Sequence, residues 1–290
     1  MPPSVTVNDI ELAYLEWGPG DGPLAVLLHG FPDSAHTWRH LGPELAAAGF
    51  HAVAPFMRGY APSAVPPDGR YQTGMLAMDA LALRAALGGD RPSVLVGHDW
   101  GASATWLAAV HGGVDAWSRV VGMAVPPGGA MAAAFMRYEQ LQRSWYMFFF
   151  QHGLSDIVVG MNDLAFIDGL WADWSPGYDA AEDLALLKES LRAPENLGAA
   201  LGYYRATLSG VGVDPSLDAV QGAGAAAPPQ PALYLHGAND GCIGIEVAAG
   251  AGDFLTTAGS RAEVVEGAGH FLHLEQQALV NALITEFVTS

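Results

Sequence analysis

The sequence predicts an α/β fold with a mostly parallel sheet covered by helices on both faces. Short runs of apolar residues, rich in Val, Leu and Ala, alternate with longer stretches that have helical patterns. Continuous apolar runs are typical of parallel strands, which are buried on both faces and need helices to connect them. The expected strands are 24–30, 51–55, 93–98, 119–125, 232–237 and 262–267, and the clearest helices are 75–88 and 102–112.

The alternation stops between residues 127 and 229. This stretch has helical, aromatic-rich patterns without a clear strand, and it ends in the loop-like segment VQGAGAAAPPQP at 220–231. We therefore expect a core domain formed by 1–127 and 229–290, with a helical cap (lid) domain inserted at 128–228. A cap over the carboxyl ends of parallel strands creates a ligand crevice between the two parts.

The charge balance narrows the classes of partner. The 290 residues include 30 acidic and 12 basic side chains, the formal net charge is -18, and Lys188 is the only lysine. Since phosphate binding needs basic side chains, nucleic acid and anionic membranes are poor partners, and a small neutral ligand is favoured. The composition leaves the oligomeric state open and is compatible with a homodimer.

The amino terminus and the cysteine content predict a cytoplasmic protein. The first residues, MPPSVTVNDIELAYLEWG, have neither the basic nor the apolar segment of a secretory signal, and no stretch reaches the ~18 apolar residues of a membrane helix. The single Cys242 excludes an internal disulfide, and we interpret it as a small buried residue although Asp240 is near it in the sequence.

The segment GHDWG at 97–101 has the spacing of a nucleophile elbow. In this motif a strand turns sharply into a helix, the central side chain is exposed above the sheet, and small flanking residues let strand and helix approach. Gly97, Asp99 and Gly101 occupy the three positions, after SVLVGH and before ASATWLAAV. The alternative is that Asp99 only caps the helix, and the motif alone does not decide between the two.

An elbow nucleophile requires an acid and then a histidine base later in the chain. Asp240, in GANDG, follows the expected strand 232–237, and His270, in GAGHFLH, follows the strand 262–267. Other carboxylates nearby lie in or beside a strand or in helical patterns, so position favours Asp240. We interpret His273 as a residue at the start of a helix and predict neither a metal site nor a cofactor, because no ligand cluster has metal-site spacing.

Two backbone N–H groups are expected to form an oxyanion hole. The segment HGFPDS at 29–34 follows an early strand, so the N–H of Phe31 is expected to face the elbow together with the N–H of Trp100. One such donor contributes roughly 3–4 kcal/mol to stabilisation of the transition state. Histidines at other strand ends are expected to make local backbone contacts; they are His29, His98 and His236.

The chain resembles the α/β-hydrolase superfamily and, within it, the epoxide hydrolases, in the segments HGFPDSAHTWRH, RGYAPS, GHDWG, GANDG and GAGHFLHLEQ. The resemblance covers nearly the whole chain and implies the α/β-hydrolase fold. Two segments of the expected cap, SWYMFFFQHG and LGYYRATL, are similar to the tyrosine segments of epoxide hydrolases, which implies acid roles for Tyr146 and Tyr204. Periodicity alone leaves Tyr138, Tyr178 and Tyr203 as competitors.

The chemistry of these groups suits an epoxide. A carboxylate that attacked an ester carbonyl would form a reactive anhydride, so an aspartate nucleophile suits a saturated carbon that bears a leaving group. Epoxide opening creates an alkoxide, which a phenol with a pKa near ~10 can stabilise and protonate. We hypothesise that Asp99 forms an alkyl ester, that His270 activates the water that cleaves it, and that Asp240 orients the imidazole. The expected substrates are a small, neutral, largely apolar epoxide and water, and the product is a vicinal diol.

Two other functions are weighed against this hypothesis. Haloalkane dehalogenases resemble the chain equally well in the Asp-His-Asp triad and at Trp100, but their second halide donor corresponds to Phe31 here, and cap tyrosines have no use in their reaction. Fluoroacetate dehalogenases match less well, because Trp100 occupies the position of their arginine. A non-catalytic protein that binds a small ligand would not need nucleophile, acid and base together. Departures from many relatives at Phe56 and Ala61 indicate a distinct branch.

Overall fold

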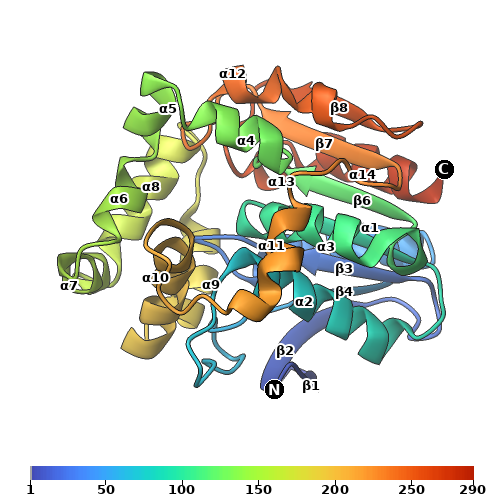
Figure 1. Ribbon diagram of the computed structural model, residues 1–290, viewed down its shortest axis with the longest axis horizontal. Coiled ribbons are helices and arrows are strands. Elements are labelled where there is room, and N and C mark those ends of the chain that lie inside the picture. The colour runs from blue at the N-terminus through green and yellow to red at the C-terminus, as the bar shows by residue number, and fades with distance from the viewer. Residues whose placement is uncertain (1) are drawn as a thin grey trace.

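The structure, a computed structural model that describes residues 2–290, is built around one eight-stranded sheet (Figure 1). The strands lie in the order β1-β2-β4-β3-β5-β6-β7-β8. Neighbours from β4 to β8 along this order are parallel, whereas β2 pairs antiparallel with both β1 and β4. The bounds are β1 (Ser4–Val7), β2 (Ile10–Trp17), β3 (Leu24–Leu28), β4 (His51–Pro55), β5 (Ser93–His98), β6 (Arg119–Met123), β7 (Ala232–Gly237) and β8 (Arg261–Val265).

All six strands predicted from the apolar runs are present, each end within about two residues of its expected position. The sequence analysis missed β1 and β2, which form a hairpin with a two-residue turn at Asn8 and Asp9. Both turn residues have positive φ, 46° and 63°, as a tight hairpin turn requires. The available signal was the alternating apolar pattern on either side of the Asn-Asp pair, which differs from the continuous runs of the buried parallel strands.

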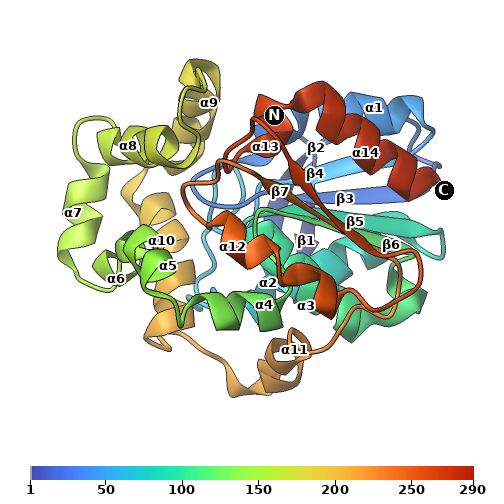
Figure 2. The same ribbon diagram turned by 90° about the horizontal axis from the view of Figure 1, so that it is seen from above.

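Helices cover both faces of the sheet, which explains why every residue of β3 and β5 is buried. Figure 2 shows α1 (Leu41–Ala47) and α14 (Gln277–Thr289) on one face and α2 (Thr73–Leu83) and α3 (Trp100–Ala116) on the other. Shorter elements of the core are η1 (Ala35–Arg39), η2 (Arg84–Gly88), α12 (Ile245–Ala248), η4 (Ala251–Phe254) and α13 (Leu272–Glu275). Within residues 2–290, no helix is both long and apolar enough to cross a bilayer.

Between β6 and β7 the chain contains helices and no strand, as the loss of alternation predicted. Figures 1 and 2 show most of these helices grouped beside one end of the sheet. The chain enters and leaves this region side by side, since a Cβ at Gly128 would lie 2.6 Å from the carbonyl oxygen of Gly224. The elements are α4 (Gly128–Ala134), α5 (Tyr138–Arg143), α6 (Trp145–Phe149), α7 (Leu154–Gly160), α8 (Ala165–Trp174), α9 (Ala181–Leu191), α10 (Pro194–Leu208), η3 (Pro215–Leu217) and α11 (Asp218–Ala223).

Polar contacts attach these helices to the loops at the carboxyl ends of the strands. The indole N–H of Trp171 in α8 donates to the carbonyl oxygen of Pro32 at 2.8 Å. The amide of Asn196 in α10 donates to the carbonyl oxygen of Gly59 at 2.7 Å. The two groups that accept these bonds lie in the loops after β3 and β4, so α8 and α10 are held over the strand ends where the predicted site residues lie.

Candidate active site

The GHDWG segment forms a sharp turn between β5 and α3. Asp99 has φ 53° and ψ -116°, a conformation that non-glycine residues rarely adopt. A Cβ at Gly97 would lie 2.2 Å from the carbonyl oxygen of Gly101, and one at Gly101 would lie 2.1 Å from that of Leu28. Both glycines are therefore required by close backbone approach, and the turn directs Asp99 into a cavity that its side chain lines.

Asp99, Asp240 and His270 meet at the carboxyl ends of β5, β7 and β8. The His270 Nδ1 lies 2.9 Å from Asp240 Oδ2, and the His270 Nε2 lies 3.6 Å from Asp99 Oδ2. The other oxygen of Asp240 accepts hydrogen bonds from the backbone N–H groups of Cys242 and Ile243, at 2.7 and 2.8 Å. These two bonds fix the carboxylate so that its free oxygen faces the imidazole.

The two carboxylates set the charge state of His270. Burial alone would lower its pKa, but the charge and hydrogen bond of Asp240, together with Asp99, outweigh burial and raise the pKa to about 10. Burial likewise acts to raise the pKa of Asp240, but the charge and hydrogen bond of His270 more than offset this and lower the pKa of Asp240. The two carboxylates therefore favour the imidazolium form of His270 in the resting site.

The proposed oxyanion-hole residues lie beside the nucleophile. The backbone N–H of Phe31 donates to Asp99 Oδ1 at 2.8 Å. Trp100 is the first residue of α3, where backbone N–H groups have no partner within the helix. The structure therefore brings Phe31 into direct contact with the carboxylate and places Trp100 next to it in the chain.

Tyr146 in α6 and Tyr204 in α10 line the same cavity as Asp99. Their side chains are buried, and their ring centroids lie 5.7 Å apart. The hydroxyl of Tyr146 lies 3.3 Å from the sulfur of Cys242, and that of Tyr204 has no hydrogen-bond partner among residues 2–290. Burial raises the pKa of both phenols well above 10, so both keep their protons and can act as donors.

The competing tyrosines have other environments. Tyr203 donates its hydroxyl to the carbonyl oxygen of Arg58 at 2.8 Å, and Tyr178 donates to Asp183 Oδ2 at 2.7 Å. Tyr138 is 70% exposed. None of the three is among the described residues that line the cavity with Asp99, and neither are Phe56 and Ala61, where the chain departs from the family pattern.

The histidines at the strand ends bond to the backbone, as predicted, but the contact of His98 is with a distant segment and is not local. His29, His98 and His236 each have an Nε2 atom 2.9–3.1 Å from a backbone group. The partner of His98 is the carbonyl oxygen of His270, so His98 supports the loop that carries the proposed base.

Sequence spacing did not reveal a group formed by Asp33, His98 and His273. One potential ligand atom from each lies within 4.8 Å of the others, and all three side chains are buried. Burial lowers the pKa of His98 to about 4, lowers that of His273 and raises that of Asp33. The sequence analysis missed this group because its members come from three distant segments, and His273 lies inside the short helix α13.

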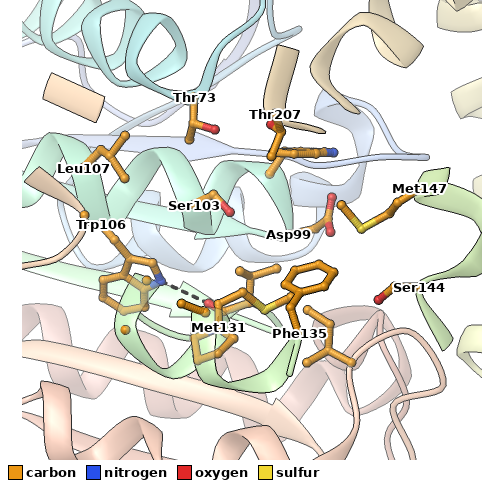
Figure 3. Close-up of a pocket in the computed structure, with 18 of the residues that line it drawn as sticks. Thr73, Asp99, Ser103, Trp106, Leu107, Met131, Phe135, Ser144, Met147 and Thr207 are labelled. Atoms are coloured by element: carbon orange, nitrogen blue, oxygen red, sulfur yellow. Dashed lines mark hydrogen bonds between the residues drawn. The ribbon is translucent and has the colours of Figure 1, made fainter. Parts of the chain in front are cut away.

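A cavity of about 560 Å³ extends from Asp99 along α3 (Figure 3). This volume is within the usual range for small-molecule sites. Its lining is largely apolar and comes from β5–α3, from the helices between β6 and β7, and from the loop after β7. The arrangement brings together a carboxylate, an imidazole held by a second carboxylate, and two buried phenols.

Comparisons with known proteins agree with this arrangement. Residues 23–277 match the alpha/beta hydrolase fold family. The chain is 28% identical to epoxide hydrolase A of Mycobacterium tuberculosis, over 98% of this chain and 96% of the relative. It is 30% identical to epoxide hydrolase 3 of Xenopus tropicalis, over 97% of this chain and 75% of the relative. Among solved structures, epoxide hydrolase A of Mycobacterium thermoresistibile superposes with a TM-score of 0.82 at 26% identity, covering 100% of this chain and 98% of that one.

Proposed function

Because the chain belongs to the epoxide hydrolase family of the α/β hydrolases, we propose that it converts an epoxide and water to a vicinal diol through an ester on Asp99. In this proposal Asp99 is the nucleophile, His270 the base, Asp240 the group that orients His270, and Tyr146 and Tyr204 the acids. No cofactor or metal is part of the reaction. Residues 128–228 act as the cap domain that carries both phenols.

In the first step Asp99 Oδ2 attacks one carbon of the epoxide. Oδ1 is already engaged by the N–H of Phe31, which leaves Oδ2 available. A C–O bond forms to the carboxylate, the ring C–O bond breaks, and a phenol donates its proton to the released oxygen. The phenolate that remains is reprotonated from water.

In the second step a water molecule attacks the carbonyl carbon of the ester. His270 Nε2 takes a proton from this water, and the negative charge that develops on the former Oδ1 is stabilised by the N–H groups of Phe31 and Trp100. The intermediate collapses, the imidazolium returns the proton to the departing alkoxide, and the diol leaves. Asp99 is released as a carboxylic acid with one oxygen that came from water, and its proton passes to His270, which restores the resting site.

Ester formation also prepares the base. In the resting site the charges of Asp240 and Asp99 both raise the pKa of His270. When Asp99 becomes a neutral ester, its contribution disappears, so His270 releases its proton to water more readily. Ester formation therefore favours the neutral form of His270 at the stage that requires a base, while Asp240 continues to raise its pKa.

The observation that carries this proposal is the pair of buried phenols that line the same cavity as Asp99. A dehalogenase has no need of two acids, and the position of its second halide donor is occupied by Phe31, whose side chain has no N–H. A binding protein has no need of a carboxylate in strained geometry beside a charged imidazole. Epoxide opening uses all of these groups.

The test supplies the protein with 1,2-epoxybutane, styrene oxide and 1-bromobutane and measures diol and halide. Diol formation without halide release supports the proposal, and halide release without diol contradicts it. In a His270→Gln variant, ester cleavage loses its base, so intact-protein mass should increase by the mass of one epoxide. An unchanged mass with an epoxide that the parent enzyme hydrolyses would contradict the ester route. The cytoplasmic location and the homodimer remain predictions.

A further inference from the structure

The cavity extends away from Asp99 along one helix. Ser103 and Leu107 lie four and eight residues beyond Asp99, so they follow it on the same side of α3 and line the cavity in succession (Figure 3). At a rise of 1.5 Å per residue, Asp99 and Leu107 are about 12 Å apart along the helix. This part of the cavity, lined by Ser103, Trp106 and Leu107, is called the arm below.

Exposed lining residues lie in and beside α4 and α11, whereas Asp99 is buried. Cavity residues near the nucleophile are buried, including Trp100, Ser144 and Met147. Cavity residues in and beside α4 and α11 include the exposed Ala132 and Gln221. A ligand whose far end reaches these exposed residues would lie along the arm with its other end at Asp99.

Three buried aromatic rings pack behind groups that lie close to Asp99. Phe31, Phe150 and Trp174 are each at most 2% exposed, and none belongs to the described lining of the cavity. The ring centroids of Phe31 and Phe150 lie 5.6 Å apart, and Phe150 packs on Tyr204 at 5.0 Å. Trp174 packs on His270 at 5.1 Å. These three residues, called the aromatic wall, fill the space behind Tyr204 and His270.

The lining also disfavours a charged substituent on the substrate. Asp99 is its only charged residue, and among the described residues that form it there is no Lys, Arg or His. A carboxylate on the far end of a substrate would lose its hydration without gaining a cationic partner, in a chain whose net charge is -18. The arm therefore suits an uncharged group.

We propose that the preferred substrate is a terminal epoxide with one long, neutral, apolar substituent, which lies along the arm while the ring reaches Asp99. This inference rests on the proposed function. An alkyl chain of roughly eight to ten carbons spans the ~12 Å of the arm. Epoxides that carry a substituent on both ring carbons would press one substituent against the aromatic wall, and epoxy fatty acids would bring a carboxylate into an apolar cavity.

The first experiment measures kcat/KM for terminal epoxides from 1,2-epoxypropane to 1,2-epoxydodecane. Each added methylene buried in the arm should increase kcat/KM by about threefold to fourfold until the arm is filled at roughly ten carbons. The isomer trans-5,6-epoxydecane should be at least ~100-fold poorer than 1,2-epoxydecane, given the cost of overpacking a closed wall. Equal rates for the isomers, a flat length series, or a better rate with 9,10-epoxystearate would overturn the inference. Absence of diol from every epoxide would instead refute the proposed function.

The second experiment alters the arm. Leu107→Trp should lower kcat/KM for 1,2-epoxydecane by more than ~10-fold and leave 1,2-epoxypropane within about twofold, because the short substrate does not reach residue 107. Leu107→Met is the matched control, since it nearly conserves volume. Equal losses on both substrates with an unchanged Tm would contradict the assignment. If Leu107→Trp does not fold, Ala132→Trp, at an exposed position of the lining, makes the same comparison.

A third variant alters the wall. Phe150→Ala removes a buried ring beyond the nucleophile and should increase the ratio of kcat/KM for trans-5,6-epoxydecane to that for 1,2-epoxydecane by at least ~10-fold. An unchanged ratio in a folded variant would show that the wall does not exclude internal epoxides.

Discussion

Replacement of Asp240 by Asn tests the electrostatic coupling on which the site depends. The amide oxygen of Asn can still accept the backbone N–H groups of Cys242 and Ile243, which leaves the amide NH₂ facing His270 Nδ1. Nδ1 must then accept a hydrogen bond, so the neutral ring carries its proton on Nε2. An Nε2–H group cannot take a proton from water, and the ester-cleavage step loses its base.

The free energy involved follows from the pKa of His270. A pKa of about 10 in the folded protein, against 6.5 for an unperturbed histidine, corresponds to roughly 5 kcal/mol. Because the folded pKa is raised, this stability is fully present below pH 6.5 and is lost as pH rises through about 10. The charge and hydrogen bond of Asp240 are the largest effects that raise the pKa of His270 against burial. Asp240→Asn should therefore lower the free energy of unfolding by about 3–5 kcal/mol near pH 6.

Urea unfolding at about pH 6 and at about pH 10.5 measures this effect, and the difference between the parent and Asp240→Asn should shrink at the higher pH. In kinetic assays, the variant should open about one equivalent of epoxide, form about one ester per protein, and then turn over ~10⁴-fold more slowly than the parent. Asp253→Asn, at an exposed carboxylate, is the matched control. A stability difference that does not depend on pH, or steady-state turnover equal to that of the parent, would refute the reasoning.

Two further predictions concern the phenols and the elbow. Tyr146→Phe and Tyr204→Phe should each slow ester formation by about 10²–10⁴-fold in single-turnover assays, whereas Tyr203→Phe, which loses only its bond to a backbone carbonyl, should lower Tm and leave ester formation unchanged. Full activity of the double variant would mean that other groups supply the proton. Gly101→Ala should destabilise the protein by about 1–3 kcal/mol, because its Cβ would lie 2.1 Å from a backbone oxygen that cannot move away. Gly198→Ala, in α10 with nothing within 4 Å of the added Cβ, should stabilise it by about 0.5–1 kcal/mol, and urea unfolding that shifts both variants in the same direction would contradict this account.

Neighbouring residues on a helix show why part of the site could not be obtained from the sequence. Tyr203 and Tyr204 are adjacent in α10, but successive helical side chains point about 100° apart. Tyr204 consequently faces the cavity, while Tyr203 contacts the backbone at Arg58. Composition and periodicity are the same for both, and only the resemblance to a known family favoured one of them in advance.

The sequence by itself determined the α/β class, the helical insertion, and the positions of Asp99, Asp240 and His270. Each of these depends on local chemistry: parallel strands buried on both faces need continuous apolar runs, and the elbow admits only glycine where backbones nearly touch. Only the tertiary structure decided which phenols line the cavity with Asp99, that Asp33, His98 and His273 come together, and that the cavity extends from Asp99 along α3. These features depend on how distant segments pack in three dimensions, and no spacing within one segment encodes that packing.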